Sequence, residues 1–110
     1  MGNYVDFTAG NKDYKLRIST RNVVSLEKRL GMNPIAVFGD GDRIPTITEM
    51  INILSASLQQ LNHGVSYDDA FDIFDAYLDD GHSATDFIPI IVDIYRASGL
   101  ISKGDSGEKN

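Results

Sequence analysis

The stretch that decides the fold class is residues 4–18, YVDFTAGNKDYKLRI. Apolar side chains alternate with polar ones at residues 5–7 and again at residues 14–18, the period-two pattern of half-buried strands. Residues 10–13, GNKD, have turn chemistry, because glycine and asparagine tolerate a positive φ. The pattern predicts a β-hairpin with a loop of about four residues. A lone hairpin is marginal in water, so we expect it to pack on helices or to extend a partner's sheet.

The rest of the chain shows helical spacing and helix-end signals. Ser19 or Thr20 can cap a first helix that ends at Gly31, and Asn33 followed by Pro34 opens a short helix through Phe38. Thr46 to Glu49 has the spacing of a capping box. We expect the main helices near residues 20–30, 47–62, 67–80 and 86–98.

The caps of the last two helices follow from similar signals. Ser66 is the expected cap of the helix near residues 67–80, and Thr85 the preferred cap of the last helix. A cap at Thr85 places Pro89 in or next to the first turn, where a missing N–H costs least, whereas a cap at Ser83 predicts a bend. Gly99 is the expected stop, with Leu100 folding back on the helix.

These elements predict the fold class α+β, mainly α-helical, with an N-terminal β-hairpin followed by a compact bundle of about four helices. Residues 1–101 form the single predicted domain, and residues 102–110 are a polar tail that we expect to be flexible. The N-terminus lacks the basic and apolar regions of a signal peptide, and no apolar run reaches the roughly 18 to 20 residues of a membrane helix. We therefore expect a cytosolic protein with no membrane partner.

The composition favours binding over catalysis. With no cysteine and only two histidines, His63 and His82, each beside a glycine at an expected helix end, the chain offers no zinc site and no nucleophile with its base. The acidic run around Asp79 fails the ligand register of an EF-hand. A net charge of -6 argues against a nucleic-acid partner. We expect no catalytic residue, no metal and no cofactor.

Two of the expected helices carry faces suited to a protein partner. The helix from Ile47 has a far side that is polar but uncharged: Thr48, Asn52, Ser55, Gln59 and Asn62. Such a face is compatible with solvent, and it also loses little on leaving water against another protein. The last helix is apolar on nearly every side. It is either the central helix of the bundle or presents partner-binding residues, namely Ile88, Val92, Tyr95 and the following Leu100.

Charge is unevenly distributed along the chain. The residues up to Gly31 contain six basic and three acidic side chains, a balance of +3, and the remainder has four basic and thirteen acidic ones, a balance of -9. Helical spacing aligns four carboxylates in one acidic stripe: Asp68, Asp72, Asp75 and Asp79. A solvated surface explains this asymmetry. Alternatively, Lys15, Arg17 and Arg21 of one copy approach the stripe of the next in a head-to-tail homo-oligomer, a ring or an open spiral.

Four segments, in this order, carry a resemblance to a known family: residues 14–18 (YKLRI), 24–34 (VSLEKRLGMNP), 66–70 (SYDDA) and 94–100 (IYRASGL). Together they resemble the tail assembly chaperones of long-tailed phages and prophages, and the similar small protein of gene transfer agents. The likeness extends over about residues 4 to 101.

The resemblance implies a non-enzymatic helper in the host bacterial cytoplasm. Such chaperones coat the aggregation-prone tape measure protein until the tail tube protein polymerises around it, and they are absent from the mature virion. Many also exist in a longer form made by ribosomal frameshifting. Two other classes remain open: a head–tail connector or another small phage structural protein, and an acidic DNA-mimic inhibitor, which the basic first third argues against.

Overall fold

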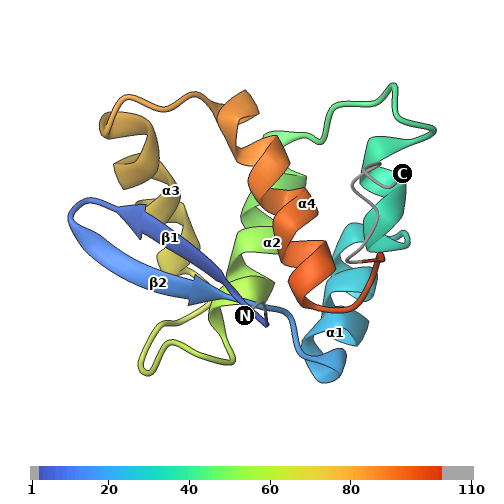
Figure 1. Ribbon diagram of the computed structural model, residues 1–110, viewed down its shortest axis with the longest axis horizontal. Coiled ribbons are helices and arrows are strands. Elements are labelled where there is room, and N and C mark those ends of the chain that lie inside the picture. Colours follow the sequence, from blue (N-terminus) through green and yellow to red (C-terminus); the bar gives the residue numbers. More distant parts are fainter. Residues whose placement is uncertain (1–2, 103–110) are drawn as a thin grey trace.

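The computed structural model describes residues 3–102, and it places a two-stranded antiparallel sheet against a set of helices (Figure 1). In chain order the elements are β1 (Val5–Ala9), β2 (Lys12–Leu16), α1 (Thr20–Leu30), the 3₁₀ helix η1 (Pro34–Phe38), α2 (Ile47–Leu58), α3 (Asp69–Asp79), the 3₁₀ turn η2 (Ala84–Asp86) and α4 (Phe87–Ala97). The predicted fold class is confirmed. Most of the predicted tail lies outside the described residues.

The hairpin is tighter than the sequence predicted. Ala9 pairs with Lys12, so the turn contains two residues, Gly10 and Asn11, with φ of 59° and 65°. Two positive φ angles make a type I′ turn, whose twist matches that of the strands. The predicted loop of about four residues is wrong, because Lys12 and Asp13 already belong to β2.

The hairpin packs on helices of its own chain. β1 contacts α3 and α4, and β2 contacts α2. Phe7 and Ala9 are buried, and the chain leaving β2 is anchored where the Arg17 N–H donates to the Ser57 carbonyl at 3.0 Å and the Ile18 N–H to Ser98 Oγ at 2.8 Å. Helices thus supply the cover that an isolated hairpin lacks.

α2 is the central helix, in contact with α1, α3, α4 and β2. Nine of its twelve residues are buried, against five of eleven in α4, so the alternative that made the last helix central is not what the structure shows. α2 also ends at Leu58, short of the predicted residue 62. Beyond it, Asn62 folds back: its Oδ1 accepts from the Lys15 N–H at 2.9 Å and its Nδ2 donates to the Lys15 carbonyl at 2.7 Å.

The ends of α1, α3 and α4 test the cap predictions. Ser19 caps α1, as predicted. The N-cap of α3 is Asp68 and not the predicted Ser66, although Ser66 exchanges hydrogen bonds with Asp69 just before the helix. Ser83, not the predicted Thr85, forms a capping box with Asp86 before α4. The η2 turn takes up the three intervening residues, so Pro89 still lies in the first turn of α4.

The C-terminal end of α4 is as predicted. Gly99 has φ 81°, and the Leu100 N–H donates to the Tyr95 carbonyl at 2.9 Å. This hydrogen bond and the left-handed Gly99 are the features of a Schellman motif, in which the chain reverses over the last helical turn.

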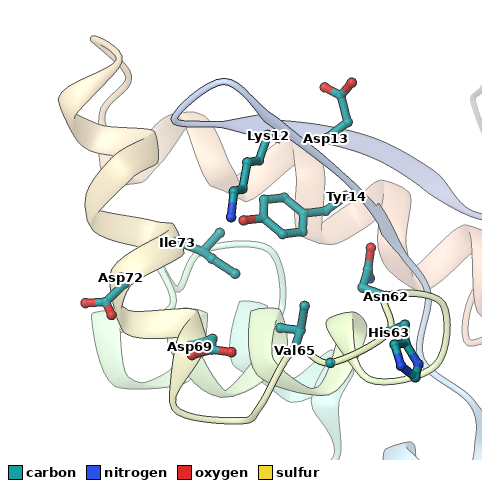
Figure 2. A pocket seen from close by; sticks show the side chains of 10 residues that line it. Lys12, Asp13, Tyr14, Asn62, His63, Val65, Asp69, Asp72 and Ile73 are labelled. Atoms are coloured by element: carbon teal, nitrogen blue, oxygen red, sulfur yellow. The ribbon is translucent and has the colours of Figure 1, made fainter.

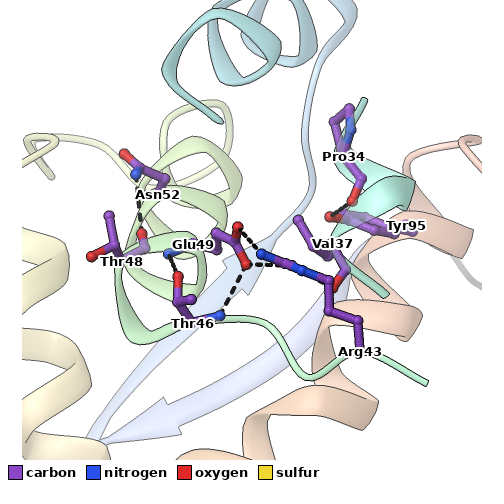
Figure 3. A network of polar contacts seen from close by, with 8 residues as sticks. All are labelled: Pro34, Val37, Arg43, Thr46, Thr48, Glu49, Asn52 and Tyr95. Carbon is purple, nitrogen blue, oxygen red and sulfur yellow. Dashed lines mark hydrogen bonds and ion pairs between the residues drawn. The ribbon is translucent and has the colours of Figure 1, made fainter. Parts of the chain in front are cut away.

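A polar network fixes the segment between η1 and α2 (Figure 3). The Arg43 guanidinium donates to both carboxylate oxygens of Glu49 at 2.8 Å and to the Val37 carbonyl at 2.8 Å. Glu49 also completes the predicted capping box with Thr46. The hydrogen bond from Arg43 holds the pKa of the Glu49 carboxyl below its ordinary value, so this nearly buried carboxylate stays charged.

Candidate protein-binding groove

The predicted partner-binding residues of the last helix mostly serve the core. Tyr95 is only 1% exposed, and its hydroxyl donates to the Pro34 carbonyl at 2.8 Å (Figure 3). Its prediction as a contact residue is therefore corrected, because the side chain is not accessible. Ile88 and Leu100 are half-buried and pack against the core, and Val92 is half-buried. For these three, partner binding stays a prediction.

The residues of the predicted self-association surface have different environments. The four carboxylates of the stripe, Asp68, Asp72, Asp75 and Asp79, are all exposed, as are Lys15 and Arg21. Arg17 is engaged within its own chain, where Nη1 donates to Gln60 Oε1 at 3.2 Å and Nε to the Ala97 carbonyl at 3.4 Å. Arg17 is therefore poorly placed to pair with another copy. The head-to-tail contact itself stays a prediction.

A groove lies where α1, α2 and α3 meet, and we call it the α2–α3 groove. Its cavity volume is about 270 Å³. It is lined by Arg29, Ile47, Thr48, Ile51, Asn52, Ser55, Tyr67, Asp68 and Phe71. Two large apolar side chains of its lining are open to solvent, Ile47 at 52% and Phe71 at 58% exposure, while Ile51 is buried. Exposed apolar side chains around a concave surface are typical of a protein-binding site.

Two polar side chains of the lining donate hydrogen bonds to the backbone of the same chain. Asn52 Nδ2 donates to the Thr48 carbonyl at 3.0 Å, and Ser55 Oγ donates to the Tyr67 carbonyl at 2.9 Å. A polar group that is already hydrogen-bonded costs less to bury than one that must give up water. The groove is therefore better suited to an apolar occupant than its residue types suggest.

Tyr67 and Arg29 close one side of the groove. The Arg29 guanidinium carbon lies 4.1 Å from the centre of the Tyr67 ring, a cation–π contact that joins α1 to the segment before α3. The Tyr67 hydroxyl is buried and has no hydrogen-bond partner within residues 3–102. Burial raises the pKa of this hydroxyl, with Arg29 acting in the opposite direction. The Tyr67 hydroxyl is therefore a destabilising feature of this side of the groove, since a buried donor without a partner costs free energy.

Residues 5–109 match the model of a family of unknown function, DUF6096. The chain belongs to this family. No curated protein and no solved structure matches the chain. The match begins at β1 and extends beyond α4, so every element that lines the groove lies inside the DUF6096 region.

Sequence reasoning missed the groove although it identified one of its walls. The uncharged polar face of the helix from Ile47 supplies Thr48, Asn52 and Ser55. Phe71, however, shares the apolar face of its helix with Phe74, and Ile47 belongs to the apolar face of α2, so the pattern gave no sign that either is exposed. The available signal was a helix face of hydroxyl and amide side chains without charge, in a chain with 24% charged residues.

A second hollow, the hairpin pocket, lies between β2, the α2–α3 connection and α3 (Figure 2). Its volume is about 570 Å³. It is lined by Lys12, Asp13, Tyr14, Asn62, His63, Gly64, Val65, Asp69, Asp72 and Ile73. Figure 2 shows Lys12 and Tyr14 directed toward each other above Ile73, with Asp13 directed away.

Several polar groups of the hairpin pocket hold the fold together. Asn62 bridges to the Lys15 backbone, Asp69 Oδ2 accepts from the Ser66 N–H at 2.8 Å, and Asp13 Oδ1 accepts from the Thr8 hydroxyl at 2.7 Å. Burial, and then the charge of Asp69, raise the pKa of Tyr14. The pocket is therefore mainly a polar junction between the hairpin and α3.

The structure gives two further observations on residues 3–102. No group of three or more histidine, aspartate or glutamate side chains in this part of the chain is arranged to hold a metal ion. No helix in the same range is long and apolar enough to cross a membrane. Of the two histidines, His63 lines the hairpin pocket and His82 stacks on Tyr77 with ring centres 4.3 Å apart.

Proposed function

We propose that this protein is a non-enzymatic assembly helper that binds a client protein in the α2–α3 groove. The observation that carries the proposal is the exposure of Ile47 and Phe71 on the lining of one concave surface. Full burial of an exposed side chain of this size contributes about 1.5–3 kcal/mol, so covering the exposed half of Ile47 and of Phe71 contributes about 0.8–1.5 kcal/mol each, before the cost of association.

We propose further that the client is the tape measure protein of a long-tailed phage or prophage. Support comes from the resemblance of four segments of the chain to tail assembly chaperones. In this proposal the protein acts in the host bacterial cytoplasm, hands its client to the tail tube protein and is absent from the mature virion. Its own homo-oligomer and a frameshift-extended form are further partners.

The dimensions of the groove suit this kind of client. A volume of about 270 Å³ between helices accommodates apolar side chains from one face of a helix, as in other helix-in-groove complexes. A long client presents many such faces, so a modest affinity at each site still gives tight overall coverage.

Co-expression with the proposed client, a tape measure protein of a long-tailed phage or prophage, tests the proposal. The double variant Ile47→Ala/Phe71→Ala should reduce co-purification of the client by at least about tenfold, because it removes both exposed apolar contacts. The matched control is Val24→Ala/Ile44→Ala, which removes two side chains that are 47% and 65% exposed outside the groove. Both variants should keep the helical circular dichroism of the parent protein.

Three results would contradict the proposal in different ways. Equal loss of client in both double variants would mean that exposed apolar surface matters generally and that the groove is not the site. Undiminished co-purification with the groove variant would remove the groove from the proposal. Recovery of the protein from purified virions would favour the head–tail connector instead.

A further inference from the structure

We propose that the occupant of the α2–α3 groove is a basic amphipathic helix, with an apolar face against Phe71 and Ile47 and lysine or arginine residues beside it. This inference rests on the proposed function and adds the chemistry of the client segment. It follows from the composition of the groove lining and from the charges that surround it.

The apolar part of the occupant follows from the groove itself. Phe71 and Ile47 are exposed and Ile51 is buried, while one amide N–H of Asn52 and the hydroxyl of Ser55 already donate within the chain. Such a lining gains little from a polar side chain and gains hydrophobic burial from an aliphatic or aromatic one.

The basic part of the occupant follows from α3. Asp68 and Asp75 stand three residues before and four residues after Phe71, so they flank it on the surface of the helix. Within residues 3–102, no ion pair involves a carboxylate of the acidic stripe. A helix that packs on Phe71 therefore brings its flanking residues next to unpaired carboxylates, which favours positive charge.

The cation already at the groove does not cancel this preference. Arg29 belongs to α1, and its guanidinium is held over the Tyr67 ring in the segment before α3. A cation of the occupant would lie next to Asp68 at the start of α3 and Asp75 within it. An acidic occupant would instead face like charges along the whole of α3.

The probe is a helical peptide of about 16 residues made of leucine and lysine, with leucines at i, i+3, i+4 and i+7, and a leucine–glutamate peptide of the same pattern. Binding is measured by fluorescence anisotropy against the whole chain. The lysine peptide should bind at least about tenfold more tightly than the glutamate peptide. Phe71→Ala should weaken lysine-peptide binding by at least about fivefold.

Charge-removing variants separate local from general electrostatics. Asp68→Asn/Asp75→Asn should weaken lysine-peptide binding by about three- to tenfold and reduce its dependence on salt. Asp40→Asn/Asp42→Asn removes the same net charge from an exposed loop outside the groove and should leave binding within about twofold.

The outcomes that overturn the inference differ from those that overturn the function. If the client is lost with Phe71→Ala but the two peptides bind equally, the function stands and the charge preference is wrong. If Phe71→Ala leaves lysine-peptide binding unchanged, the peptide binds elsewhere and the inference fails. If sedimentation shows that the chain alone is oligomeric and that Phe71→Ala makes it monomeric, a second copy occupies the groove and the inference is wrong.

Discussion

Phe71 and Phe74 lie three residues apart on α3 and belong to the same apolar pattern, yet they have opposite environments. Phe74 is 2% exposed and packs edge-on against Phe87, with ring centres 5.5 Å apart, and against Tyr77. Phe71 is 58% exposed at the α2–α3 groove. The same residue type on one helix therefore stabilises the fold at one position and is available to a partner at the other.

The largest expected effect on stability is the loss of the Phe74 side chain, compared with the loss of the Phe71 side chain. Phe74→Ala should lower the free energy of unfolding by about 3–5 kcal/mol, because it leaves a cavity among packed rings. Phe71→Ala should change it by less than about 0.5 kcal/mol, because the side chain is exposed. Urea unfolding followed by circular dichroism measures both values. Comparable losses for the two variants would mean that Phe71 is part of the core and that the contrast is mistaken.

An intermediate effect is expected at the start of α2, where Glu49 is charged and nearly buried. Glu49→Gln should lower the free energy of unfolding by about 1–3 kcal/mol at neutral pH, because Arg43 loses a charged partner with two hydrogen bonds. This site extends the comparison, because here a polar network stabilises the fold, as Phe74 does in the aromatic cluster. The control is Glu27→Gln, an exposed position on α1.

The same carboxylate gives a pH dependence with a definite sign. The folded-state pKa of Glu49 lies below its ordinary value of 4.5, so its contribution is complete above that value and is lost as the pH falls through the lowered folded-state pKa. The difference in unfolding free energy between the parent protein and Glu49→Gln should therefore stay constant from neutral pH to about pH 5 and narrow as the pH falls below 4.5. A difference that stays constant below pH 4.5 would contradict the assigned role of the Arg43 contact.

The smallest expected effect is at Tyr67, on the groove side of the comparison. Tyr67→Phe should leave the free energy of unfolding unchanged or raise it by up to about 1 kcal/mol, since the variant removes a buried hydroxyl that has no partner within residues 3–102. Thermal and urea unfolding measure this. A clear loss of stability would show that the Tyr67 hydroxyl is hydrogen-bonded in the folded protein.

Local signals in the sequence were sufficient for several elements. Alternation over residues 4–18 identified the strands, the Thr46–Glu49 spacing identified a capping box, and Gly99 identified the end of the last helix. Each of these depends on residues only a few positions apart, where backbone preference and short-range hydrogen bonds dominate. The hairpin turn was assigned too long because its two residues were not separated from the strand residues that follow.

The candidate site could not be predicted to the same degree. Helical periodicity shows which residues share a face, and it grouped Phe71 with Phe74, but it carries no information about which neighbouring element covers that face. The same holds for Tyr95, which periodicity left open to a partner and which the structure buries with its hydroxyl on the Pro34 carbonyl.

The sequence by itself determined the class of fold, the start of α2, the end of α4 and the acidic stripe on α3, because these follow from residue types at fixed short spacings. Only the tertiary structure decided that α2 is central, that α4 is largely core and that α1, α2 and α3 leave a groove with exposed apolar side chains. The physical reason is that burial depends on contacts between segments far apart in the chain. β1 covers α3 near Phe74 through Phe7 and Tyr77, whereas Phe71 remains largely exposed.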